Sequence, residues 1–156
     1  MEFLVLNWQR LMDLSLDLSL VIRDSGYRPD SVVAILRGGY IVGKLVSDFL
    51  GVEDLVVLGL TSYGARVGQG EEPIITYPII HDLRGRNALI VDDVADTGKT
   101  LITARDLLRF YGAGEVRTAT LYVKPWSRTK PDYYVDTTDR WIVFPWEVGE
   151  VIRNRL

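Results

Sequence analysis

The stretch from Leu89 to Leu101 constrains the fold more than any other part of the chain. It reads Leu-Ile-Val-Asp-Asp-Val-Ala-Asp-Thr-Gly-Lys-Thr-Leu. The apolar run Ala88–Val91 is typical of a strand covered on both faces, and residues 97–100 open an amphipathic helix. Three carboxylates therefore lie between a buried strand and the unpaired amides at a helix start. They are Asp92, Asp93 and Asp96.

Two simple interpretations of this stretch fail. Gly-Lys-Thr after a strand is the second half of a nucleoside triphosphate P-loop, but the glycine needed five residues before Gly98 is Asp93. A carboxylate there would repel phosphates and would not favour the left-handed turn. A plain solvated turn with Asp96 as the helix cap explains one acid and leaves Asp92 and Asp93 unexplained. Grouped carboxylates repel each other unless a cation or hydroxyl groups satisfy them.

A third interpretation divides the work between amides and acids. The amides of residues 96–100 lie at a helix N-terminus, where they can hold a phosphate monoester. Asp92 and Asp93 can accept hydrogen bonds from a cis-diol. The stretch therefore favours a ribose 5-phosphate as its ligand.

This stretch resembles the signature of the type I phosphoribosyltransferases, in which four hydrophobic residues and two acids come before Asp-Thr-Gly-Lys-Thr. The resemblance implies that Asp92 and Asp93 contact the ribose of phosphoribosyl pyrophosphate and hold Mg2+. It also implies that Asp96 accepts a proton from the base. The implied cradle for the 5′-phosphate includes Ala95, Asp96, Thr97, Gly98, Lys99 and Thr100.

Composition and charge limit the other possibilities. The chain has 156 residues, of which 47% are hydrophobic, so we predict one domain over residues 1–156. The net charge is −3 and the basic residues are scattered, which argues against a nucleic-acid partner. Residues 14–22 are apolar but are interrupted by Asp17 and are too short to span a membrane, and no basic region precedes the first apolar residues. We expect a cytoplasmic protein, and the lack of cysteine excludes disulfides and thiolate metal sites.

Strand and helix patterns alternate along the chain, which predicts an α/β fold with a parallel sheet flanked by helices. A helix over residues 8–25 is expected to be capped by Asn7 and ended by Gly26, with one apolar face made by Leu11, Leu14, Leu18, Val21 and Ile22. Further helices are expected at 40–50 and from 97 to 111. Strands are expected at 31–36, 54–60, 88–91, 116–124, 133–136 and 141–144, and residues 73–80 are expected to be extended.

The loop Arg37-Gly38-Gly39 follows a strand, so it is expected at the same sheet edge as the acids. Two glycines with exposed amides beside an arginine can hold a polyphosphate. The resemblance implies that Leu36, Arg37, Gly38 and Gly39 hold pyrophosphate, with a cis peptide between Leu36 and Arg37.

Residues 61–72 contain Gly64, Gly68 and Gly70 and few apolar residues, which is typical of a flexible loop. Ser62 and Tyr63 at its start are similar to a Ser-Tyr pair in the hypoxanthine and guanine branch of the family. The resemblance implies a loop that closes over the reacting centre and keeps water out.

The C-terminal third contains the residues that we expect to select the base. Taken alone, Trp141 and Trp146 are typical core aromatics. The segments over residues 124–147 nevertheless resemble the base-binding hood of the 6-oxopurine phosphoribosyltransferases, especially the short xanthine-guanine type. The resemblance implies that Trp141 stacks on the purine, that the backbone of Ile142 and Glu147 reads its far edge, and that Lys124 faces the 6-oxo oxygen. Lysine only donates hydrogen bonds, so it favours a carbonyl over the amino group of adenine.

Glu147 marks a departure from the xanthine-guanine type, which typically carries aspartate after Pro-Trp, and it is a third expected metal contact beside Asp92 and Asp93. The resemblance as a whole implies transfer of a phosphoribosyl group from phosphoribosyl pyrophosphate to a 6-oxopurine, with Mg2+ as cofactor. The alternatives are a nucleotide-sensing regulator on the same fold and a phosphoribosyltransferase for adenine or a pyrimidine. We expect a homo-oligomer, a dimer or tetramer, because Leu16 and Leu20 lie off the main helical face.

Overall fold

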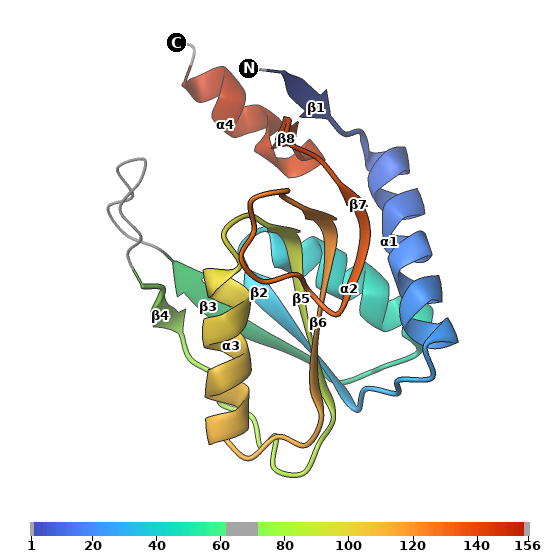
Figure 1. Cartoon of the computed structure of the whole chain (residues 1–156), viewed down its shortest axis with the longest axis vertical. Helices are drawn as coiled ribbons and strands as arrows, with labels where there is room; N and C mark the ends of the chain where they lie inside the picture. Colours follow the sequence, from blue (N-terminus) through green and yellow to red (C-terminus); the bar gives the residue numbers. More distant parts are fainter. Residues whose placement is uncertain (1, 62–71, 155–156) are drawn as a thin grey trace.

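The computed structural model describes residues 2–61 and 72–154, and its centre is a six-stranded sheet (Figure 1). The strand order is β4-β3-β2-β5-β6-β7, in which β4 is antiparallel to β3 and the other neighbours are parallel. The strands are β2 (Ser31–Leu36), β3 (Leu55–Thr61), β4 (Ile74–Tyr77), β5 (Ala88–Ala95), β6 (Val116–Val123) and β7 (Tyr133–Thr137). The predicted α/β class and mainly parallel sheet are confirmed.

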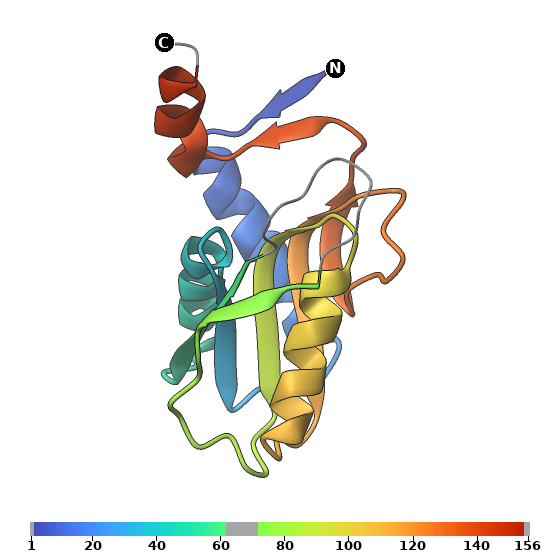
Figure 2. The same ribbon diagram turned by 90° about the vertical axis from the view of Figure 1, so that its left-hand side faces the viewer.

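Helices cover both faces of this sheet, as Figure 2 shows in side view. Helices α1 (Trp8–Asp24) and α2 (Gly39–Leu50) pack on one face, and α3 (Lys99–Phe110) packs on the other. Successive residues of the central strands point to opposite faces: Leu89 joins the hydrophobic cluster under α1 and α2, whereas Ile90 joins the one under α3. Double coverage explains why the apolar run in β5 is uninterrupted.

Helix α1 begins at the predicted residue, ends one residue earlier than predicted, and has a partly different buried face. The Asn7 side chain accepts a hydrogen bond from the Arg10 amide at 2.8 Å, which makes it the expected N-cap. Val21 was predicted to be buried and is 46% exposed. Ser15 and Ser19 are buried in this helix, and each hydroxyl donates to a backbone carbonyl one turn earlier. The prediction for Val21 was wrong because the serines take the buried positions on this helix. Their hydroxyls are hydrogen-bonded within the helix, so these small residues can pack closely, which a hydrophobic pattern does not indicate.

A second, small sheet joins the two ends of the described chain. Strand β1 (Phe3–Val5) pairs in parallel with β8 (Trp141–Val143), and the 3-10 turn η1 (Pro145–Glu147) and helix α4 (Val148–Arg153) follow. Figures 1 and 2 show these elements together above the carboxyl ends of β5 and β6. The sequence predicted the C-terminal hood but not the contribution of β1 to it.

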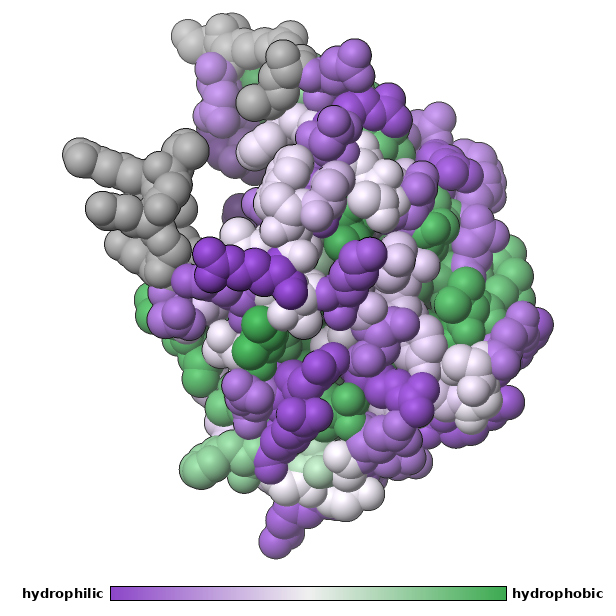
Figure 3. Space-filling view, viewed as in Figure 1, coloured by the Kyte–Doolittle hydropathy of each residue, from purple (hydrophilic) through white to green (hydrophobic). Residues whose placement is uncertain are grey.

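In the part of the chain that the structure describes, no helix is both long and apolar enough to cross a bilayer. The face in Figure 3 is mostly hydrophilic, with hydrophobic residues in separate patches.

Candidate active site

The acid pair Asp92 and Asp93 lies inside β5, at its carboxyl end. The strand was expected to stop at Val91, but pairing with β6 continues to Ala95, with Asp92 opposite Thr120. Both acids are partly buried. The Asp93 amide donates to Asp92 Oδ1 at 2.9 Å, and the Val94 amide donates to Asp93 Oδ1 at 2.8 Å. These bonds fix the orientation of both carboxylates.

The environment of the pair disfavours its negative charge. Burial, together with the charge of Asp93, raises the pKa of Asp92 well above its usual range. Burial, together with the charge of Glu147, raises the pKa of Asp93 to about 6. Two neighbouring carboxylates in such a place attract a cation or hydroxyl donors, as the sequence predicted.

The loop between β2 and α2 lies directly against these acids. A Cβ atom added at Gly38 would lie 2.0 Å from Asp93 Oδ2, and one added at Gly39 would lie 2.6 Å from the Val91 carbonyl oxygen. Only glycine allows this approach. The peptide between Leu36 and Arg37 is cis, as expected, and Arg37 is exposed at the loop. The structure therefore brings together the predicted pyrophosphate loop and the predicted ribose acids.

The expected 5′-phosphate cradle forms the start of α3. Gly98 is the N-cap of α3 and has a φ of 84°. A Cβ atom added at Gly98 would lie 2.9 Å from the Thr129 carbonyl oxygen, so the Thr129 backbone packs closely against this turn. The Lys99 amide is 3.4 Å from Thr97 Oγ1, and Lys99 Nζ is 3.4 Å from Glu72 Oε1. Thr100 follows in the first turn, and Ala95 is buried just before the loop. The geometry suits an anion held by amides at a helix N-terminus.

Asp96, the expected proton acceptor, is exposed beside this cradle and has a partner that the sequence analysis did not consider. Trp126 Nε1 donates to Asp96 Oδ1 at 2.7 Å. The only signal in the sequence is the position of Trp126, two residues after Lys124. Because indole hydrogen bonds to distant carboxylates have no spacing rule, the contact needed the structure.

The expected base-binding residues lie where β6 meets the hood. Lys124 is 8% exposed, and burial lowers its pKa while Asp96 and Asp139 act in the opposite direction. Its Nζ donates to the carbonyl of Arg140, the residue before Trp141. Trp141 is 57% exposed, which suits a stacking surface better than a core position. Trp146, by contrast, stacks on Phe144 with ring centroids 4.8 Å apart, as the core interpretation predicted.

Comparison with known proteins shows the family of this chain. A match to the phosphoribosyl transferase domain spans residues 5–153. The chain is 33% identical to the xanthine-guanine phosphoribosyltransferase of Gluconobacter oxydans over 120 residues, which are 76% of this chain and 68% of that protein. The chain belongs to the phosphoribosyltransferase family. The resemblance drawn from the sequence is confirmed.

Solved structures extend the likeness of this phosphoribosyltransferase to nearly its whole length. The crystal structure of a purine phosphoribosyltransferase from Pyrococcus horikoshii is 39% identical with a TM-score of 0.83, and covers 94% of each chain. A hypothetical protein from Neisseria gonorrhoeae with bound ppGpp is 26% identical with a TM-score of 0.83, and the match covers 99% of this chain and 95% of that one.

Glu147 and Ile142 complete the account of the predicted base and metal residues in this phosphoribosyltransferase. Ile142 is buried in β8, where its backbone pairs with β1. Glu147 Oε2 accepts from the Phe144 amide at 3.0 Å, and its charge acts on Asp93. Within residues 2–61 and 72–154, no three acidic or histidine side chains form a compact metal-binding group. The acid pair still fits Mg2+, which is commonly held by one or two carboxylates with substrate and water oxygens.

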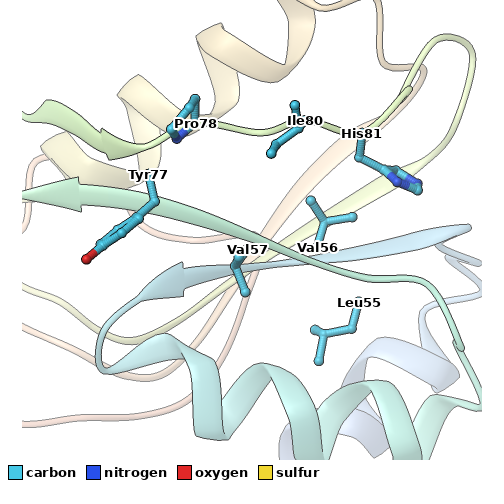
Figure 4. Close-up of a pocket in the computed structure, with 7 residues that line it drawn as sticks. All are labelled: Leu55, Val56, Val57, Tyr77, Pro78, Ile80 and His81. Carbon is cyan, nitrogen blue, oxygen red and sulfur yellow. The ribbon is translucent and has the colours of Figure 1, made fainter.

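The expected loop residues Ser62 and Tyr63 lie outside the described residues. An open cavity of about 430 Å3 is found elsewhere, between β3 and residues 77–81 (Figure 4). Its β3 residues, Leu55 to Val57, lie at the start of that strand, whereas the acids of β5 lie at a strand end. Hydrophobic side chains dominate its lining, which includes none of the residues predicted for the active site.

Proposed function

We propose that this phosphoribosyltransferase moves the 5-phosphoribosyl group of phosphoribosyl pyrophosphate to a 6-oxopurine, giving a purine nucleoside 5′-monophosphate and pyrophosphate. One observation carries the proposal: Gly38 and Gly39 lie against the carboxylates of Asp92 and Asp93. A pyrophosphate on the loop amides and a ribose on the acids would thus be neighbours, as the two halves of one substrate must be. The relatives named for purine phosphoribosyl transfer support the same reaction.

The residues around the acids divide the binding of phosphoribosyl pyrophosphate. Asp92 and Asp93 accept hydrogen bonds from the ribose hydroxyls and would hold Mg2+, with Glu147 as a further contact. When bound, Mg2+ supplies positive charge to the pyrophosphate oxygens. Arg37 and the amides of Gly38 and Gly39 take up negative charge on the leaving group. The start of α3 holds the 5′-phosphate.

The base enters between Lys124 and the hood. Lys124 Nζ donates to the 6-oxo oxygen, and Trp141 stacks on the ring with about 1 to 3 kcal/mol that does not distinguish among purines. A charged hydrogen bond of about 1.5 to 3 kcal/mol from Lys124 favours oxopurines over adenine by roughly tenfold to a hundredfold. The backbone of Ile142 and Glu147 reads the far edge of the base.

Asp96 completes the reaction as the proton acceptor. As the purine nitrogen attacks the anomeric carbon, the bond from that carbon to the pyrophosphate oxygen breaks. The proton on the imidazole ring of the base then passes to the Asp96 carboxylate. Ser62 and Tyr63 would belong to a loop that keeps water from the cation-like carbon.

The test is turnover of isotope-labelled guanine, hypoxanthine, xanthine, adenine and uracil with phosphoribosyl pyrophosphate and Mg2+. We expect nucleoside monophosphate from one or more of the three 6-oxopurines and little from adenine or uracil. Formation of no nucleotide from any base would refute the proposal, and preference for adenine or uracil would refute the role of Lys124.

A nucleotide-sensing role on the same fold is the second candidate. The Neisseria gonorrhoeae protein, solved with bound ppGpp, supports it, because a guanosine carrying two diphosphates shares the groups that this site would recognise. Calorimetric titration with guanine nucleotides separates the two candidates. Tight binding without turnover of any base favours the sensor, and turnover favours the enzyme.

We also infer that the protein forms a homo-oligomer. Helix α1 exposes Trp8, Met12 and Leu16, each to more than 40%. These apolar side chains lie on the helix that forms one outer layer of the fold, where a second copy would cover them. Light scattering coupled to size exclusion would show a dimer or tetramer, and a monomeric mass would contradict the inference.

A further inference from the structure

Trp126 stands out because it is a large aromatic residue at the site that lies outside the core and was not among the residues expected to contact the base. Its side chain is 56% exposed, so burial contributes little to its position. An exposed indole N–H can bond water without loss. Instead, Trp126 Nε1 donates to Asp96 Oδ1 at 2.7 Å, across a separation of 30 residues.

The segment that carries Trp126 is fixed to the phosphate cradle. The Ser127 amide donates to the Lys124 carbonyl at 3.0 Å, which closes a tight turn around Trp126. The Arg128 amide donates to the Thr97 carbonyl at 3.2 Å, and the Thr129 carbonyl lies against Gly98. Trp126 is therefore held in a defined place relative to Asp96, whereas an exposed aspartate alone would sample several rotamers.

The chemistry of the contact suits a proton acceptor. The indole N–H donates only, so its partner must be an acceptor oxygen such as that of the Asp96 carboxylate. One oxygen of Asp96 accepts this bond, and no group of the described residues donates to the other, which can take a proton. Trp126 also contacts Lys124, the residue that would donate to the 6-oxo oxygen of the base. Lys124 Nζ lies 5.4 Å from the centre of the Trp126 ring. One side chain thus contacts both residues that the reaction would use on the base.

We propose that Trp126 is a positioning residue that orients Asp96 for removal of the proton from the purine. This inference rests on the proposed function, in which Asp96 accepts that proton. The proposed role belongs to an exposed residue in the segment after β6, outside the signature of residues 89–101.

Two substitutions at Trp126 separate the hydrogen bond from the bulk of the ring. Trp126→Phe keeps an aromatic ring and removes the donor. Trp126→His keeps an N–H at the equivalent place in a five-membered ring and removes the second ring. Both are assayed with guanine at pH 8.5, where an imidazole with an ordinary pKa near 6.5 is neutral. Phe110→Leu, at an exposed aromatic residue at the carboxyl end of α3, is the control.

We expect Trp126→Phe to lower kcat by roughly tenfold to a hundredfold with KM for guanine and phosphoribosyl pyrophosphate within about twofold, because the proton acceptor loses its orientation. Trp126→His and Phe110→Leu should keep kcat within about threefold. In an Asp96→Asn background, Trp126→Phe should have no further effect.

Wild-type kcat in Trp126→Phe overturns the inference, and so does an equal fall in Trp126→His, which would mean that the ring itself is needed. An additive loss in the double variant also overturns it. In each of these cases the wild-type enzyme is active, so the proposed function stands. A wild-type protein that makes no nucleotide refutes the proposed function and the inference together.

Discussion

Asp93→Asn should stabilise the ligand-free protein at neutral and alkaline pH. Burial raises the pKa of Asp93 to about 6, so the folded protein binds this proton more tightly than the unfolded chain does. The free energy of unfolding therefore falls as pH rises from 3.8, the ordinary value, to about 6. Below that window the destabilisation is absent, and above it the destabilisation is complete.

The size of the effect follows from the shift. At about 1.36 kcal/mol for each pKa unit, a rise from 3.8 to about 6 corresponds to about 3 kcal/mol above pH 6. The side chain is partly exposed, and water screens part of the charge, so we expect a gain of about 1 to 3 kcal/mol. Asparagine keeps an Oδ1 acceptor for the Val94 amide, which now donates to Asp93 at 2.8 Å. Loss of the Asp93 charge also relieves Asp92, whose pKa it helps to raise.

The assay is urea unfolding at pH 4 and pH 8, with EDTA present and tryptophan fluorescence as the signal. We expect a higher midpoint for Asp93→Asn at pH 8 and only a small part of that gain at pH 4. Asp96→Asn is the matched control, because this exposed acid should change stability by less than about 0.5 kcal/mol. No gain at pH 8, or the same gain at both pH values, would refute the electrostatic explanation.

Three further substitutions test other parts of the site. Gly38→Ala places a Cβ atom 2.0 Å from Asp93 Oδ2, so it should destabilise the protein by about 1 to 3 kcal/mol. It should also weaken the binding of phosphoribosyl pyrophosphate measured by calorimetry. Gly149→Ala, whose Cβ would have nothing within 4 Å, should have neither effect. Lys124→Met should lower the ratio of guanine to adenine turnover by roughly tenfold to a hundredfold, and equal losses would contradict this. Glu147→Gln removes a charge that raises the pKa of Asp93, so the loss of stability from pH 4 to pH 8 should shrink, and an unchanged loss would argue against that contact.

The sequence predicted most of the fold because local patterns and tertiary structure agree. The β-branched run in β2 and β5 indicated strands covered on both faces, and Asn7 indicated the start of α1. The pairing of β1 with β8 was missed because a three-residue strand has no periodicity and its partner lies far along the chain. Val21 was misplaced because two internally bonded serines took the buried positions.

The candidate site was predictable to the extent that its parts follow strand ends. Asp93 and Gly38 were expected at one edge because parallel strands place their carboxyl ends together. Their contact was not predictable, because a shift of the loop between β2 and α2 by a few tenths of an ångström would change it. Trp126 was missed for a similar reason, because its contact with Asp96 joins two loops rather than two regular elements.

The two carboxylates that repel each other, Asp92 and Asp93, lie on β5, a strand packed on both faces. In β5, Leu89 and Val91 belong to the hydrophobic cluster on one face, and Ala88 and Ile90 belong to the cluster on the other. This packing fixes the backbone of β5, so the carboxylates of Asp92 and Asp93 stay beside each other in a partly buried place. A bound cation and ribose hydroxyls would supply the missing partners, so ligands should stabilise wild type more than Asp93→Asn. Relief of the repulsion that lowers stability without ligand would then contribute to the binding of the proposed substrate and metal.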